Sequence, residues 1–215
     1  MNTLTQILLS LMLVINLLLA SSSRISPMIK CVAFSGALVG LMMISMGHHY
    51  TIGLITIAVK AFILPALLFY AMKKAKVQRE IEPLVGYAMS IVIVFGFTIV
   101  SGILANSGAL GDRPLPLTVA LTTILTGLFI ICARKKALTQ VVGFLVFENG
   151  IGIFGSSVSV ENSLIVELGI LLDVFVLIFI LGIAMWEISR TFSSIDTDKL
   201  NQLGDNHLMK GGHHA

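Results

Sequence analysis

Residues 51–72 read TIGLITIAVKAFILPALLFYAM, and this apolar run holds a single charged side chain, Lys60. A helix needs about 20 residues, most of them apolar, to cross the hydrocarbon core of a bilayer. Further runs of this kind cover residues 3–20, 28–46, 84–105, 117–133, 138–158 and 164–188. The pattern predicts an all-α fold, a polytopic membrane bundle of about seven transmembrane helices.

The composition leaves little room for anything else. The chain has 215 residues, of which 56% are hydrophobic and 12% charged, and the charged share is roughly half that of an ordinary soluble domain. We therefore expect a transmembrane bundle over residues 1–188 and a cytoplasmic tail over residues 189–215. The first run could also be a signal peptide, but no Lys or Arg precedes it, which favours a retained helix.

The basic residues predict the orientation of the bundle. By the positive-inside rule, loops rich in Lys and Arg face the cytoplasm, which here places the N-terminus outside and the C-terminus inside. A patch of basic residues with interleaved aromatics is not seen, so nucleic acid is not an expected partner. The residues that mark the cytoplasmic side are Arg24, Lys30, Lys73, Lys74, Lys76, Arg79, Arg134, Lys135, Lys136, Arg190, Lys199 and Lys210.

Gly36 and Gly40 form a small-xxx-small pair in the second apolar run. Such pairs let two helices approach closely within a membrane. Packing inside one bundle explains them, and self-association is the weaker alternative.

Four ionisable residues lie within the predicted spans: Lys60, Glu148, Glu167 and Asp173. A charge at the centre of a span costs about 2.5–3.5 kcal/mol even on the mildest scale, so it needs a reason. At 1.5 Å per residue, three of the four lie about 15 Å from the membrane surface at which their span begins, whereas Glu167 is about 9 Å nearer the outer surface. Glu187, in contrast, lies at the predicted cytoplasmic end and can reach the interface.

These depths predict a proton relay through Lys60, Glu148, Glu167 and Asp173, because carboxylates and lysines at one level can exchange protons laterally between helices. The alternative is a permanent ion pair of Lys60 with one carboxylate that only holds the helices together. The sequence lacks a glycine-rich phosphate loop, a Ser/His/Asp set, an axial histidine pair and a four-cysteine cluster. We therefore expect no catalytic residue, no metal site and no cofactor in this chain.

Two motifs carry a family resemblance: VGFLVFENG at 142–150 and LIVELGILLD at 164–173. Together with Lys60 five residues before Pro65 and the tail sequence IDTDKL at 195–200, they resemble component E of hydrogenase-4-type membrane complexes. The last three spans, and the helices over 138–188 in particular, are also similar to the K-type subunit of complex I and the C-type subunit of multisubunit cation/proton antiporters.

In those K-type and C-type families, two membrane carboxylates on neighbouring helices are implicated in proton transfer. Asp173 matches the second of them. The match of Glu148 to the first is loose, because Glu148 follows Gly143 by five positions where the K-type carboxylate follows its glycine by two. One helical turn separates the two positions.

The resemblance implies a subunit of a bacterial or archaeal cell (inner) membrane, surrounded by lipid and lying between a quinone-module-like anchor and antiporter-like subunits. The cytoplasmic hydrogenase-like arm of such a complex holds a NiFe centre and iron–sulfur clusters in partner subunits. The chain alone is then not an enzyme. Two alternatives stay open: a subunit of a cation/proton antiporter without a redox arm, and a purely structural membrane subunit.

Overall fold

The computed structural model describes residues 3–45, 50–74, 85–108 and 113–158, together with residues 176, 178–180 and 182. Helices make up the regular structure of this described part, which confirms the all-α prediction. In chain order they are α1 (Thr3–Ser21), α2 (Ile25–Ser45), α3 (Tyr50–Ile57), the π-helix η1 (Ala58–Ile63), α4 (Leu64–Lys74), α5 (Tyr87–Asn106), α6 (Pro114–Ala133) and α7 (Ala137–Val158).

Six helices of the described part are long and apolar enough to cross a membrane. They correspond to the first six predicted spans, and α3, η1 and α4 together form the third. Most of the predicted seventh span, 164–188, lies outside the described residues. Val176 and Ile180, which the structure does describe within it, are helical and buried against the core.

Two helices begin earlier than the sequence pattern predicts. α2 starts at Ile25 and α6 at Pro114, where the predicted spans begin at residues 28 and 117. Each helix has proline in its first turn, Pro27 in α2 and Pro114 and Pro116 in α6. The first turn tolerates proline because the N–H groups there have no partner within the helix.

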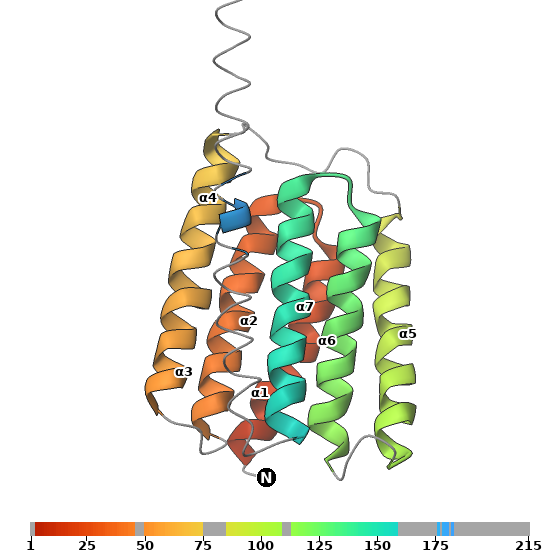
Figure 1. Ribbon diagram of the computed structural model, residues 1–215. Helices are drawn as coiled ribbons and strands as arrows, with labels where there is room; N and C mark the ends of the chain where they lie inside the picture. The colour runs from red at the N-terminus through yellow and green to blue at the C-terminus, as the bar shows by residue number, and fades with distance from the viewer. Residues whose placement is uncertain are drawn as a thin grey trace, which may run out of the picture.

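The helices alternate in direction and stand side by side (Figure 1). α2 contacts the α3–η1–α4 helix on one side and α7 on the other, α7 packs on α6, and α6 packs on α5. α1 packs against one face of this row and contacts α2, α5 and α6. The alternation brings Arg24, Lys74 and Arg134 to the same end of the bundle, which we call the basic end, and Arg113 to the opposite end.

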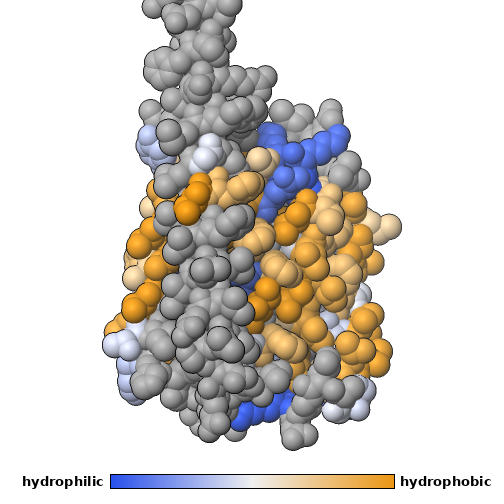
Figure 2. Space-filling model, viewed as in Figure 1, coloured by the Kyte–Doolittle hydropathy of each residue, from blue (hydrophilic) through white to orange (hydrophobic). Residues whose placement is uncertain are grey.

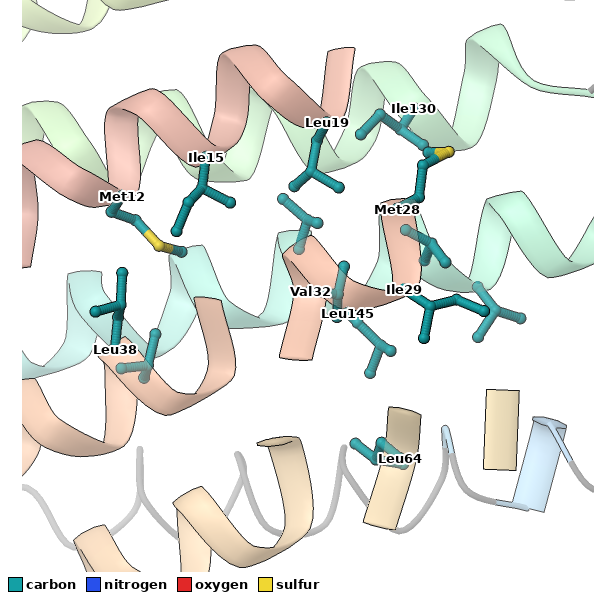
Figure 3. Packing of buried hydrophobic residues seen from close by; sticks show 14 of the residues in the cluster. Met12, Ile15, Leu19, Met28, Ile29, Val32, Leu38, Leu64, Ile130 and Leu145 are labelled. Carbon is teal, nitrogen blue, oxygen red and sulfur yellow. The ribbon is translucent and has the colours of Figure 1, made fainter. Parts of the chain in front are cut away.

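Apolar side chains fill the interior and also cover much of the outside. Side chains from α1, α2, α6 and α7 meet in one core, which includes Met12, Val32, Ile130 and Leu145 (Figure 3). The described surface is largely apolar around its middle, and most of its hydrophilic residues lie near the two ends (Figure 2). A helix that is apolar all round is typical of a membrane span.

Candidate functional site

Lys60 lies inside the π-helix η1, between α3 and α4. The wider turn shows in the backbone, where the N–H of Leu64 donates to the carbonyl oxygen of Val59, five residues earlier. Pro65 comes directly after Leu64, and a proline within a helix lacks an N–H and clashes with the carbonyl four residues before it. A widened turn relieves this clash, and single π turns of this kind occur frequently at functional sites.

Glycines of α2 allow the lysine backbone to come close. A Cβ atom added to Gly36 would lie 2.6 Å from the Cβ of Lys60, and one added to Gly40 would lie 2.5 Å from Cγ1 of Ile57. Real side chains do not approach so closely, so larger residues would push η1 away from α2. The prediction that Gly36 and Gly40 serve helix packing within the bundle is confirmed.

The Lys60 ammonium meets Glu148 of α7 in the interior. Its Nζ lies 2.8 Å from Oε1 of Glu148, and the two side chains are 10% and 2% exposed. The same Nζ donates to Oδ1 of Asn149 at 3.2 Å. Among the described residues this ion pair joins two helices near the middle of their lengths, and it places Lys60 and Glu148 at one level, as their positions in the sequence predict.

Asn149 extends the site to α2. Its Nδ2 donates to Oγ of Ser35 at 2.9 Å, and the Ser35 hydroxyl donates to the carbonyl oxygen of Val32 at 2.9 Å. Asn149 and Ser35 are both buried. A hydrogen-bonded chain therefore runs from α2 through Asn149 to the ammonium in η1 and on to Glu148.

Close contact with α6 fixes the rotation of α7. A Cβ added to Gly143 would lie 2.9 Å from the backbone nitrogen of Ile131, and one added to Gly150 would lie 2.6 Å from that of Ile124. A Cβ at Gly127 would meet the backbone of Phe147. Since successive helix residues are about 100° apart, a helix that turns Phe147 towards α6 turns the next residue, Glu148, towards α2 and η1.

The structure brings together two of the four predicted relay residues. Glu167 and Asp173 lie outside the described residues, so their expected places in the relay stay predictions. The sequence reasoning missed Asn149 and Ser35. Their signals were an amide directly after Glu148 and a hydroxyl directly before Gly36, in spans that are otherwise apolar.

Lys60 and Glu148 are groups that can exchange protons. Within the described ranges, no group of three His, Cys, Asp or Glu residues is arranged to hold a metal ion. A carboxylate can gain a proton and an ammonium can lose one, and both events change the charge balance of a buried pair. Asn149 can keep accepting from the Lys60 ammonium while Glu148 changes state.

Comparison with known proteins gives one informative match. Over 158 residues, which are 72% of this chain and 72% of the relative, the sequence is 32% identical to the uncharacterized protein Rv0085 of Mycobacterium tuberculosis. The two proteins belong to one family. No protein-family model and no solved structure matches the chain.

Proposed function

We propose that this chain is a proton-conducting membrane-arm subunit of a complex I-related, energy-converting oxidoreductase of the hydrogenase-4 type. The observation that carries the proposal is the buried contact of Lys60 with Glu148, 2.8 Å long. Intramembrane charges are costly and are functional by default. The motif resemblance supplies the kind of complex.

In this proposal the chain crosses the membrane seven times, with its N-terminus outside and its C-terminus in the cytoplasm. The six apolar helices and the single basic end of the bundle support this topology, because basic residues are retained on the cytoplasmic side. Residues 1–188 form the bundle and residues 189–215 the tail. The cell membrane of a bacterium or archaeon is the proposed location.

The relay uses the pair as a gate. A proton that reaches Glu148 neutralises its carboxylate and weakens the attraction between Glu148 and the Lys60 ammonium. The ammonium continues to donate a hydrogen bond to Oδ1 of Asn149. Loss of the proton to the next group restores the pair. Glu167 and Asp173 are proposed as the next members, on the span that comes after α7.

The proposed partners derive from the resemblance. Antiporter-like subunits, a quinone-module-like anchor and a hydrogenase-like cytoplasmic arm would surround the chain, and the NiFe centre and iron–sulfur clusters would belong to that arm. A subunit of a cation/proton antiporter uses the same membrane residues without the arm. Identification of the proteins that co-purify with the chain separates these two functions.

The short distance between Lys60 and Glu148 also favours a second candidate, a structural subunit in which the pair only holds η1 against α7. The two functions predict different effects when the Glu148 carboxylate is replaced by an amide. Glu148→Gln keeps the shape and accepts a hydrogen bond from Lys60 but cannot titrate. A relay then stops, whereas a structural pair leaves a buried ammonium without its counter-charge and destabilises the assembly.

The test is proton pumping per redox turnover by the purified complex in proteoliposomes, measured after assembly has been verified. We expect Glu148→Gln to assemble and turn over but to lose most of its pumping. Glu187→Gln is the matched control, because that carboxylate lies at the predicted cytoplasmic end, and it should pump like the wild type. An assembled Glu148→Gln complex that pumps normally would overturn the relay, and failure of assembly would favour the structural subunit.

A further inference from the structure

The side chain of Arg134 is buried at the basic end, where α6 ends and the chain turns into α7. Arg134 is 2% exposed. Its backbone N–H donates to the carbonyl oxygen of Ile130 at 3.2 Å and so closes α6, and its own carbonyl oxygen accepts from Nε2 of Gln140 in α7 at 3.0 Å. These two bonds hold the turn between the helices, so the backbone fixes where the guanidinium can lie.

The guanidinium has fewer partners than its donors require. Its Nη2 donates to the carbonyl oxygen of Ala20, at the end of α1, at 3.3 Å, and its Cζ lies over the ring of Tyr87, 4.9 Å from the centroid. Nε and Nη1 are buried and have no hydrogen-bond partner among the described residues. An arginine in a protein stays charged and carries five N–H donors. Because buried charges are nearly always paired, this state of Arg134 indicates an anion that the described residues do not supply.

The basic end has an excess of positive charge. Glu148 is the one Asp or Glu in the described ranges, and it lies midway along α7 beside Lys60. The described cations near Arg134 in the sequence or at the same end of the bundle include Arg24, Lys74, Lys135 and Lys136. The electrostatic potential of this end therefore favours the approach of an anion.

The N-terminus of α5 is a second feature that favours an anion. Its N-cap residue is Gly86, and no side chain of the described residues caps the helix. Gly86 is exposed, and a Cβ added there would have no described atom within 4 Å. The first N–H groups of a helix have no partner inside it and carry the positive end of the helix dipole, a combination that binds phosphate. Tyr87, the first residue of α5, is the residue that contacts Arg134, so the uncapped helix end and the buried guanidinium are neighbours.

The surroundings of this end fit a lipid headgroup. α5 is one of the helices that are long and apolar enough to cross a membrane, and the ends of such helices lie at the level of the headgroups. Met89 and Val92, in the first two turns of α5, are 59% and 64% exposed. Figure 2 shows hydrophilic surface at this end directly above apolar surface. A phosphate beside Gly86 would thus lie at headgroup depth, with apolar side chains below it for the acyl chains.

We propose that the N-terminus of α5 and Arg134 form a binding site for the phosphate group of an anionic membrane lipid. The first N–H groups of α5 donate to the phosphate, and Arg134 donates from Nε or Nη1. The half-buried Tyr87 ring covers the guanidinium in the chain without lipid, so the ring moves aside when the phosphate binds. The bound lipid neutralises Arg134 and connects α5 with the turn between α6 and α7. This inference goes beyond the proposed proton relay and does not depend on it.

The test is native mass spectrometry of the full chain in a neutral detergent, titrated with phosphatidylglycerol or with phosphatidylcholine. Both lipids carry a phosphate, but only phosphatidylglycerol has a net negative charge. We expect the wild type to bind a single phosphatidylglycerol at least about tenfold more tightly than phosphatidylcholine, whose cation is repelled by the site. Arg134→Met should lose this preference.

Arg113→Met is the matched control, because Arg113 is exposed and lies at the opposite end of α6. A helix of this length separates the two arginines by more than the screening distance of about 10 Å. The control should therefore bind phosphatidylglycerol within about twofold of the wild type.

Each outcome decides for or against the lipid site. Equal affinity of the wild type for the two lipids overturns it, and this comparison needs no variant, so it holds even if Arg134→Met does not fold. An unchanged preference in a folded Arg134→Met also overturns the site. Displacement of phosphatidylglycerol by millimolar inorganic phosphate would assign the site to a soluble anion instead of a lipid.

Two other sources of the counter-charge would replace the lipid if the wild type shows no preference. Loss of a subunit from the purified complex in Arg134→Met would assign the counter-charge to a partner protein. A loss of thermal stability in Glu80→Gln or Glu82→Gln equal to that in Arg134→Met would assign it to a carboxylate of this chain. Either result overturns the lipid site.

Discussion

The two sides of the bundle bury polar groups in different ways. Where α2, η1 and α7 meet, opposite charges are paired and hydrogen-bonded to Asn149. Where α1, α5 and α6 meet, the buried polar groups are neutral, and three of their oxygen atoms have no partner in the described structure. The packing differs as well. On the charged side, where α2, η1 and α7 meet, Gly36 and Gly40 allow close contact between helices. On the neutral side, where α1, α5 and α6 meet, a Cβ added at Gly102 of α5 would make an ordinary contact with Cγ2 of Thr118 at 3.8 Å.

The difference shows what each kind of polar group demands of the fold. A buried charge must be held close to its counter-charge, because an unpaired ion loses several kcal/mol of solvation. A neutral hydroxyl costs less when unpaired and can share a water instead. Where α2, η1 and α7 meet, the helices are accordingly close-packed around the ion pair. Where α1, α5 and α6 meet, three neutral polar oxygen atoms stay without a partner in the described structure.

The largest expected effect is on the charged side. Lys60→Met removes the ammonium that Glu148 contacts and should lower the free energy of unfolding by about 3–5 kcal/mol. The double variant Lys60→Met/Glu148→Gln removes both charges and should recover most of that loss. Thermal unfolding of the detergent-solubilised chain measures both. Equal stability of the single and double variants would show that the charges are not coupled.

A smaller effect is expected on the neutral side. Nδ2 of Asn16 in α1 donates to Oγ1 of Thr123 in α6 at 2.8 Å. Thr123→Val removes this acceptor and should cost about 1–3 kcal/mol in the same unfolding measurement. Thr126→Val is the control, since its hydroxyl bonds only within its own helix, and it should cost about 0.5 kcal/mol or less. If Thr123→Val cost as much as Lys60→Met, the contrast between the two sides would be lost.

The smallest expected effect comes from a comparison of Gly96, which has open space around it, with Gly36, which is in close contact with Lys60. Nothing lies within 4 Å of a Cβ added at Gly96, so Gly96→Ala should raise stability by about 0.4–1 kcal/mol through a less flexible unfolded chain. At Gly36 the same change would meet the Cβ of Lys60 and should lower stability. Both variants can be compared by thermal unfolding. A destabilised Gly96→Ala would indicate that α5 packs against something beyond this chain.

The sequence predicted the helices well and their rotations poorly. Length and hydropathy located the six helices to within a few residues, because a membrane span must be long and apolar whatever it packs against. The common depth of Lys60 and Glu148 was predictable from the rise per residue. The early starts of α2 and α6 were missed, because proline in a first turn resembles a helix breaker in a plain hydropathy pattern.

The partners Asn149 and Ser35 depend on which way each helix faces, and sequence alone did not give this. The π turn adds one residue and rotates the rest of the helix, α4, by about 100°. The rotation of α7 is set by Gly127, Gly143 and Gly150 against α6. Such rotations arise from backbone contacts between helices, which a pattern along one helix does not contain.

The Lys60–Glu148 pair also has an electrical consequence. With both groups charged the pair is neutral as a unit, so the membrane voltage exerts little net force on it. A proton that binds Glu148 leaves one uncompensated positive charge, and Glu148 lies halfway along α7. About half the voltage acts at that depth, which changes the free energy of proton loading by about 1.2 kcal/mol per 100 mV. The rate of the proposed relay would therefore depend on the electric field across the membrane as well as on the proton gradient.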